Sequence, residues 1–151
     1  MSAPRRAEEK DAAAIDALHR AAYARNRAIL GVEPIPLQTS ALKLLATMEV
    51  WLIEREGRLA GSLVLRAEPA AMLIWSVATA PDAQGHGLGG AMLDFAEARA
   101  RELKLKRMRL YTGRKLADNV AWYERRGYAT DRIETRPDRV IVHMSKPLLE
   151  G

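Results

Sequence analysis

Residues 77–91 read VATAPDAQGHGLGGA, and this stretch decides how the rest of the chain can be interpreted. It begins as the end of an apolar run, passes Pro81 and Asp82, and then carries four glycines within six residues: Gly85, Gly87, Gly89 and Gly90. Glycine adopts positive φ and lacks a Cβ, so the backbone amides of such a loop can converge on one ligand. The start of a helix adds partial positive charge there. The stretch therefore predicts an anion-binding loop between a strand and a helix.

The length and composition fit one domain, residues 1–151, with its own hydrophobic core. The chain has no cysteine and three widely separated histidines, which argues against a disulfide scaffold, thiol catalysis and a metal site. The longest apolar run, residues 70–75, is too short to cross a bilayer, and residues 1–10 lack the core of a signal peptide. We therefore expect a cytoplasmic location and no membrane partner.

The formal net charge of +5 suits a polyanionic ligand. Charges of both signs are interspersed, and no nucleic-acid reading module or aromatic stacking motif accompanies the basic residues. This pattern argues against nucleic acid as the main partner.

The first third of the chain predicts a short edge strand, two helices and a loop. The first helix is expected to start after an N-cap at Asp11 and to end before Gly31. Residues 31–39 contain two prolines and cannot form a regular helix or a central strand. Ser40 is expected to cap a short helix through Leu45.

The middle of the chain predicts a hairpin and a central strand. Residues 49–55 and 59–66 are rich in strand formers and flank a turn at Glu56 and Gly57. Residues 72–79 are apolar on both faces, which is typical of a strand in the middle of a sheet. That strand leads directly into the glycine loop.

The last third predicts two crossover helices and a closing hairpin. The helix after the loop should lead to a parallel strand at residues 108–112. A second helix, residues 116–126, should end at Gly127 in the left-handed conformation. Residues 128–134 and 140–145 then alternate as the two strands of a hairpin. The expected fold is a mixed α/β sheet with helices on both sides.

Two nucleotide-binding motifs compete for the glycine loop. Gly85, Gly87 and Gly90 formally match G-x-G-x-x-G. However, the ribose-binding carboxylate expected about 20 residues later is missing from residues 106–114, and the remaining chain is too short for a doubly wound sheet. A Walker loop is excluded because no Gly-Lys-Ser/Thr is present.

The loop and three other stretches resemble one family in the correct order. Residues 84–89, QGHGLG, resemble the Gln/Arg-x-x-Gly-x-Gly/Ala signature of the GNAT superfamily of N-acetyltransferases. Residues 77–81, 119–128 and 140–148 are similar to the preceding strand end, the later helix with its Gly-aromatic stop, and the last strand of small single-domain members of bacterial type. The resemblance implies the GNAT fold, a central splayed mixed sheet flanked by helices.

The resemblance also implies acetyl-coenzyme A as co-substrate, with no metal. The thioester arm would lie along the strand before the loop, where an N–H of Val77 or Ala78 would polarise the acetyl carbonyl. The pyrophosphate would take the loop amides. The implied cofactor-binding residues are Val77, Ala78, Thr79, Gln84, Gly85, His86, Gly87, Leu88, Gly89, Gly90, Asn119 and Tyr123.

Tyr123 is the implied catalytic residue, a general acid for the departing thiolate. On spacing alone a packing aromatic is the simpler interpretation, and the resemblance favours the catalytic one. A phenol with a pKa of about 10 keeps its proton at neutral pH and can pass it to a thiolate. Asn119 lies one turn earlier on the same helical face. Trp122 is expected in the core, and His143 is expected to be structural.

The sequence does not identify a general base. Trp75 stands where many members of the family carry a carboxylate or an amide. The acids on or near the predicted sheet are Glu49, Glu54 and Glu68. Ordered water or an amine that arrives deprotonated would also suffice.

The loop also has less positive charge than is frequent in the family. His86 and Gly90 stand at positions where arginine is common. The phosphate charge would then be met by Arg114, Lys115 or Arg125.

The resemblance implies acetyl transfer to a primary amine, on a small molecule or a protein end. The amine would enter between residues 31–39 and the closing hairpin. Trp51 and Trp75 are expected in the core, and if they face inward they would favour a partly apolar acceptor. A coenzyme A-binding sensor or decayed enzyme without turnover is the alternative, motivated by Trp75 and the missing base. A homodimer through sheet edges or the C-terminal hairpin is a further expectation.

Overall fold

The strand that leads into the glycine loop, β4 (Met72–Thr79), lies fourth in a seven-stranded mixed sheet of order β1-β2-β3-β4-β5-β7-β6. The structure is a computed structural model, and it describes residues 3–149. The central position of β4 confirms the prediction from its two apolar faces. The other strands are β1 (Arg5–Arg6), β2 (Glu49–Arg55), β3 (Arg58–Ala67), β5 (Arg107–Gly113), β6 (Ala129–Thr135) and β7 (Val140–Pro147).

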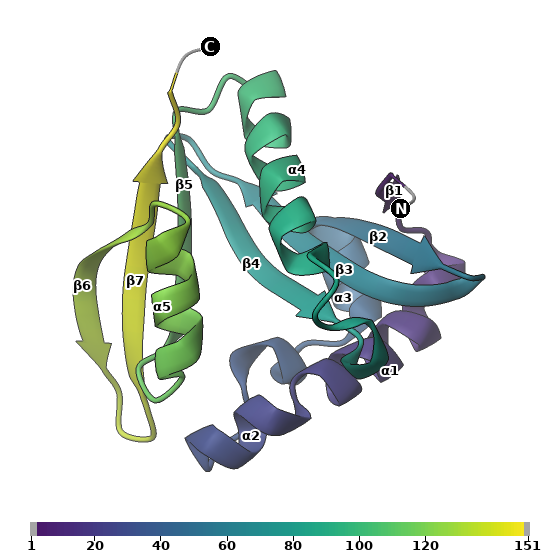
Figure 1. Ribbon diagram of the computed structural model, residues 1–151, viewed down its shortest axis with the longest axis horizontal. Helices are drawn as coiled ribbons and strands as arrows, with labels where there is room; N and C mark the ends of the chain where they lie inside the picture. Colours follow the sequence, from purple (N-terminus) through teal and green to yellow (C-terminus); the bar gives the residue numbers. More distant parts are fainter. Residues whose placement is uncertain (1–2, 150–151) are drawn as a thin grey trace.

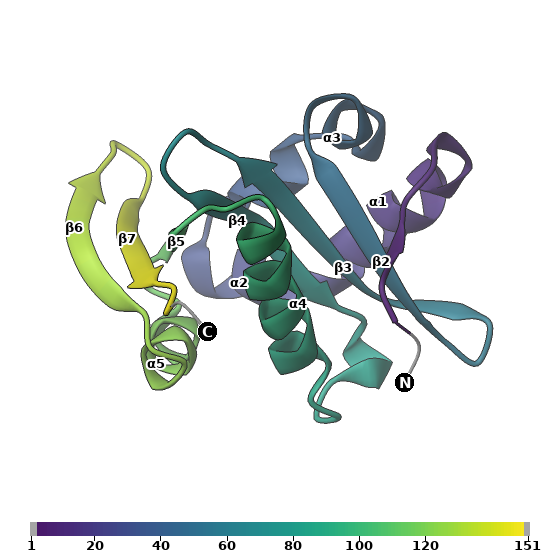
Figure 2. The ribbon, with the colours of Figure 1, turned by 90° about the horizontal axis from the view of Figure 1, so that it is seen from above.

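The helices cover both faces of this sheet, as expected for a mixed α/β fold (Figures 1 and 2). Three of them lie on one face: α1 (Ala12–Ala22), α2 (Ala24–Leu30) and α3 (Ala41–Thr47). The longest, α4 (Leu88–Glu102), and α5 (Ala117–Arg125) lie on the other face. Short 3-10 turns occupy Glu9–Asp11, Ile35–Gln38 and Pro81–Ala83.

The predicted turns and caps are largely confirmed. Glu56 and Gly57 join β2 to β3 with φ values of 54° and 74°, the left-handed pair that suits a two-residue hairpin. Ser40 caps α3 by accepting a hydrogen bond from the Lys43 amide at 3.3 Å. Gly127 has a φ of 97°, so it ends the α5 segment as expected.

The first helix differs from the prediction in two ways. It is broken at Tyr23, whose φ of −97° and ψ of 4° interrupt the helix between α1 and α2, although the second piece does end at Gly31. Asp11 is the N-cap residue of α1 as predicted, but its backbone is helical and its side chain forms no cap hydrogen bond there. Its carboxylate instead accepts the Glu8 amide and holds Arg5.

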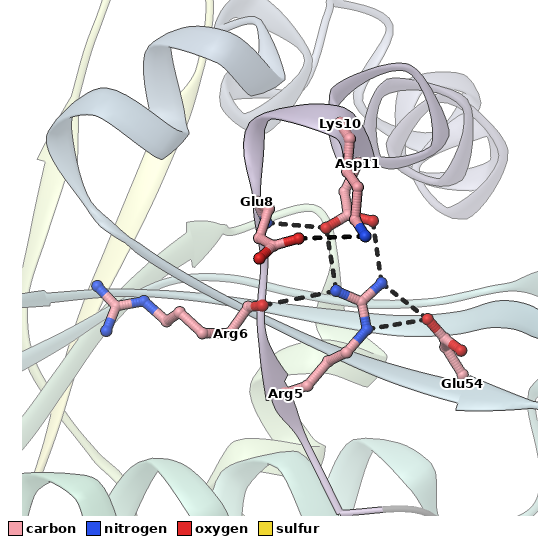
Figure 3. A network of polar contacts seen from close by, with 6 residues as sticks. All are labelled: Arg5, Arg6, Glu8, Lys10, Asp11 and Glu54. Atoms are coloured by element: carbon pink, nitrogen blue, oxygen red, sulfur yellow. Dashed lines mark hydrogen bonds and ion pairs between the residues drawn. The ribbon is translucent and has the colours of Figure 1, made fainter.

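Arg5 fastens the short edge strand β1 to its surroundings (Figure 3). Its guanidinium makes two hydrogen bonds to Asp11, at 3.0 and 2.9 Å, and two to Glu54, at 2.9 and 2.7 Å. The hydrogen bonds from Arg5 lower the pKa of Asp11 to about 2. A strand of two residues is thereby joined to both the first helical turn and β2.

The C-terminal strands are not arranged in chain order. Helix α5 leads to β6 at the sheet edge, and the chain returns as β7, which inserts antiparallel between β5 and β6. The turn that joins β6 to β7, residues 136–139, is closed by a hydrogen bond from the Arg136 amide to the Arg139 carbonyl at 2.8 Å. The predicted closing hairpin is confirmed.

Two hydrophobic clusters, one on each face, hold the helices to the sheet. The cluster under α4 and α5 includes Leu65, Met72, Met92, Leu93, Met108 and Leu110. The cluster under α1 and α3 consists of Ile15, Ala41, Leu44, Val50, Leu52 and Val64. Because both faces of the central strands are buried, the position of β4 is strongly fixed.

Candidate active site

The sheet opens between its two parallel strands. β4 and β5 pair only at Met72 with Met108 and at Leu73 with Arg109. In the next part of β4 the ladder to β3 jumps from Ile74 to Ser76, so Trp75 forms a β-bulge. A bulge bends its strand and increases the local twist, and here it accompanies the departure of β4 from β5. Beyond Leu73, the edge of β4 that faces β5 is therefore left without a neighbouring strand.

A cavity of about 380 Å³ fills this opening. Its walls are residues 74–79 of β4 and residues 110–113 of β5, with α5 on one side and the junction of α1 and α2 on the other. Pro34, Ile35 and Pro36 line it too, so the proline-rich loop is part of a pocket wall. The cavity reaches Gln84 and Gly89 at the glycine loop.

The glycine loop has the conformation that its sequence predicts. Gly85 and Gly87 have φ values of 83° and 77°, and Gly87 immediately precedes α4. The first amides of a helix have no intrahelical acceptor, so those of the Leu88 turn remain available to a ligand. The Leu88 side chain itself is only 2% exposed and packs in the core, so a contact with a ligand would have to come from its backbone.

Two glycines of this loop lie close against side chains at the α5 end of the chain. A Cβ on Gly89 would lie 3.2 Å from the Trp122 ring, and a Cβ on Gly90 would collide with the Arg126 guanidinium. Arg126 also lies 5.3 Å from the centre of the Trp122 ring. Arg126 therefore places a positive charge next to the glycine loop.

The basic residues expected to meet the phosphate charge lie outside the cavity lining. Arg125 lines a separate surface pocket with Arg126, while Arg114 and Lys115 line another pocket beside the β6–β7 turn. Arg126 does not line the cavity either, but it contacts Gly90 in the glycine loop. This contact could not be predicted from the sequence, because Gly90 and Arg126 are 36 positions apart and meet only in the folded chain.

The cavity brings together seven of the predicted cofactor-binding residues. They are Val77, Ala78, Thr79, Gln84, Gly89, Asn119 and Tyr123. Gly85, His86, Gly87, Leu88 and Gly90 lie outside its lining, in the loop next to it. The predicted residues therefore follow one another from the split in the sheet to the start of α4, where Leu88 and Gly90 are buried.

Tyr123 lines the cavity from α5, with its ring 5.8 Å from that of Tyr128 and 5.0 Å from that of Trp122. Burial, together with the neighbouring Tyr23 hydroxyl, raises the pKa of Tyr123 above its ordinary value. The phenol is therefore fully protonated at neutral pH. Trp122 is half-buried and lines the same cavity, so it is more than a core residue.

Tyr23, at the break between α1 and α2, is a pocket residue that sequence reasoning missed. Its hydroxyl lies 2.7 Å from the Ser76 hydroxyl and donates to the Val77 carbonyl at 3.3 Å. Burial raises the pKa of Tyr23 to about 12. These contacts tie the helix break to β4 just after the bulge. No glycine or proline marks the break, so no sequence signal could have located it.

The three carboxylates near the sheet do not reach the cavity. Glu49 pairs with Arg99, Glu54 with Arg5, and Glu68 with Arg109. Burial alone would raise the pKa of Glu49, but hydrogen bonds from Arg99 and Trp51 outweigh burial and lower this pKa. The hydrogen bond from Arg109 lowers the pKa of Glu68. Their positions and ion pairs argue against a role as general base.

Trp51 packs in the core as expected, whereas Trp75, also expected in the core, borders the cavity. Trp51 does not line the cavity, because it packs against Phe95 at 4.8 Å and donates its Nε1 proton to Glu49. His143 lies outside the cavity lining, 2.8 Å from Glu134, in agreement with a structural role.

Within residues 3–149 no group of three or more histidine or acidic side chains could hold a metal ion. In the same range, every helix is too short or too polar to cross a membrane.

The split mixed sheet, followed by a glycine loop that opens a helix, defines an acyl-CoA N-acyltransferase type of fold. The chain belongs to the acetyltransferase (GNAT) family, whose family model matches residues 14–128. The recognition made from the four sequence stretches is therefore confirmed.

Named relatives agree with this assignment. Over 94 residues, the chain is 32% identical to mycothiol acetyltransferase of Cellulomonas flavigena. The matched segment is 55% of this chain and only 27% of that protein. Among solved structures, the chain is similar to the ribosomal-protein-S18-alanine N-acetyltransferase of Escherichia coli, with a TM-score of 0.80, 18% identity and coverage of 100% and 97% of the two chains. It is also similar to PaiA N-acetyltransferase of Thermoplasma acidophilum in complex with coenzyme A, with a TM-score of 0.80, 17% identity and coverage of 97% and 99%. At such identities the structural similarity establishes the fold.

Proposed function

We propose that this protein is an acetyl-CoA-dependent N-acetyltransferase that acts on a primary amine. The observation that carries the proposal is the unpaired edge of β4, residues 74–79, which borders the cavity and ends at the glycine loop. An extended thioester arm can pair with such an edge as an added strand, and a pyrophosphate can take amides at the start of α4. Family membership supports the same co-substrate.

The chemistry requires a bound thioester, an uncharged amine and protonation of the leaving sulfur. The amine nitrogen attacks the carbonyl carbon, the C–N bond forms, and the C–S bond breaks. A β4 amide at Val77 or Ala78 would stabilise the carbonyl oxygen as negative charge develops. Tyr123, protonated and facing the cavity, would give its proton to the thiolate and regain one from solvent.

No residue of the described cavity lining can act as a base at neutral pH. Its titratable side chains are three tyrosines and two arginines: Tyr23, Tyr111, Tyr123, Arg25 and Arg139. The amine must therefore lose its proton to water before or during attack. This arrangement would make the reaction faster as the pH approaches the pKa of the acceptor amine.

Release of free thiol from acetyl-CoA in the presence of a panel of primary amines tests the proposal, with mass spectrometry of the acetylated product. Turnover that depends on the amine supports it. Tight binding of acetyl-CoA without amine-dependent thiol release across the panel would instead support a coenzyme A-binding sensor, which the lack of a side-chain base favours.

Because Arg126 contacts Gly90, we expect Gly90→Ala to affect stability and acetyl-CoA binding in opposite directions. Gly90→Ala should keep or slightly raise stability, since alanine is favoured over glycine in a helix by about 1 kcal/mol. It should weaken acetyl-CoA binding about threefold to tenfold, because the new Cβ displaces a guanidinium that can bind phosphate. Isothermal titration calorimetry measures the affinity.

Arg126→Gln provides the control for this prediction. Adding Gly90→Ala to Arg126→Gln should cause little further loss of affinity, because both changes remove the same contact. Fully additive losses would show that Gly90 acts independently of Arg126.

A cytoplasmic location and a homodimer remain predictions. Cell fractionation and light scattering, respectively, would test them.

A further inference from the structure

From the charges around the cavity we infer that the acceptor is an amine that also carries an oxyanion, a carboxylate or phosphate, and that Arg139 selects for it. This inference rests on the proposed function and concerns the same site. Cationic polyamines would be poor substrates.

The first reason is the charge of the cavity. Among its described lining residues the only ionic side chains are Arg25 and Arg139, and no aspartate, glutamate, lysine or histidine is present. An acceptor with a second ammonium group would find no carboxylate there and would face two guanidinium groups. Like-charge repulsion from these two guanidinium groups disfavours a ligand with an additional positive charge.

The second reason is a basic pocket next to the cavity. This pocket has a volume of about 450 Å³ and shares Leu30 and Arg139 with the cavity. Its remaining lining comes from the end of β5 and the β6–β7 turn, and its charged side chains are Arg114, Lys115, Arg136, Asp138 and Arg139. Arg136 pairs with Glu134 and Arg139 with Asp138, but the pocket keeps an excess of cationic side chains, which attracts an oxyanion.

The location of this pocket fits the acceptor rather than the co-substrate. Figure 1 shows the β6–β7 turn at the end of the sheet that lies near α2, whereas the glycine loop at the start of α4 lies on the other side of the opening. An amine that enters beside the β6–β7 turn could reach the split between β4 and β5 while its charged tail remained in the basic pocket.

The third reason is the state of Arg139 itself. Its side chain is only 9% exposed, yet its hydrogen bonds, from Nε at 3.3 Å and Nη2 at 3.0 Å, both go to a single Asp138 oxygen. Asp138 is 54% exposed and therefore largely solvated. Within residues 3–149, Nη1 of Arg139 has no hydrogen-bond partner. A guanidinium removed from water gains most from a planar oxyanion that accepts two of its protons.

The apolar part of the acceptor would lie against the other walls. Leu30, Ile35 and Trp75 line the cavity near these charges. We therefore choose probes with an aromatic body and a variable tail: phenethylamine, 4-(2-aminoethyl)benzoate, tyramine phosphate and 4-(aminomethyl)phenethylamine. Their tails are neutral, carboxylate, phosphate and cationic.

Equilibrium binding of the four probes, measured by calorimetry in the presence of coenzyme A, tests the inference without requiring turnover. We expect the carboxylate or the phosphate probe to bind about tenfold or more tightly than phenethylamine, and the cationic probe more weakly. The better of the two oxyanion probes identifies the kind of tail. Equal affinities within twofold, or tightest binding of the cationic probe, would overturn the inference.

Variants then assign the effect to Arg139. Arg139→Gln should reduce the preference for the oxyanion probe to about twofold or less, and Arg139→Lys should retain part of it, because lysine keeps the charge but loses the bidentate geometry. Arg132→Gln, on the exposed strand β6 and outside both pockets, removes the same charge and should keep the full preference. An equal loss in the Arg132 variant would mean that overall charge, not Arg139, is responsible.

Thiol release with the same probes separates the inference from the function on which it rests. Selective binding without any turnover would contradict the acetyltransferase proposal and support the oxyanion preference. Turnover without selectivity would support the acetyltransferase proposal and contradict the oxyanion preference. Thermal unfolding of each variant checks that it is folded.

Discussion

Replacement of Tyr123 by phenylalanine is expected to lower kcat about 100-fold or more, since general acid catalysis contributes roughly 10²–10⁴-fold. Tyr123 lines the cavity together with β4, and the change removes the hydroxyl group that would protonate the leaving thiolate. The ring, its packing against Trp122 and the backbone of α5 remain. The affinity for acetyl-CoA should therefore stay within about twofold. Steady-state thiol release and calorimetry measure the two quantities.

Tyr128→Phe is the matched control for this substitution. Tyr128 lies next to Tyr123, is 3% exposed, and its hydroxyl has no hydrogen-bond partner in the described structure. Removing a buried, unpaired hydroxyl should not reduce stability, and Tyr128 is outside the cavity lining, so kcat should be unchanged. If Tyr123→Phe keeps the full rate, Tyr123 is not the acid.

The pH dependence provides a second check on the role of Tyr123. Burial raises the pKa of this phenol above its ordinary value, so it should keep its proton up to at least the usual phenol pKa of about 10. Any decline of the rate at moderately alkaline pH must then come from another group. A decline that disappears in Tyr123→Phe would contradict the raised pKa.

The sequence predicted the elements whose signals are local. The bounds of β4 and the Glu56-Gly57 turn follow from apolar patterning and from residues that favour positive φ. The glycine loop follows in the same way, because Gly85 and Gly87 adopt the left-handed conformation that only glycine takes easily. These features depend on residues close together in the chain.

The features that the sequence did not predict depend on contacts between distant residues. Arg126 covers Gly90 only because α5 packs on α4, and Tyr23 reaches Ser76 only because the first helix breaks there. The bulge at Trp75 is a mismatch in the register of β3 and β4, which neither strand reveals alone. Tyr23, Trp75 and Ser76 all line the cavity, so composition and periodicity could indicate its position but not its lining.

Leu44→Ala is expected to destabilise the protein by about 2–5 kcal/mol, the usual range for deletion of a fully buried leucine side chain. Leu44 is 0% exposed and lies in the cluster that holds α1 and α3 to the sheet. Trp75, at the bulge where the sheet opens, packs against the same cluster. A cavity left by the missing atoms cannot be filled without moving α3 or the strands, so most of the lost contact energy is not recovered. Urea unfolding followed by circular dichroism measures the free energy of unfolding.

Leu42→Ala, on the same helix, is the control for the Leu44 prediction. Leu42 is 54% exposed, so its substitution removes few contacts and should change the free energy of unfolding by no more than about 0.5 kcal/mol. The two substitutions delete identical atoms and have the same effect on helix propensity, and they differ only in burial. Equal losses for the two variants would contradict the packing of α3 against β2 and the cluster beneath Trp75. A large loss for Leu44 alone would show that the wall of the opening is supported from this face of the sheet.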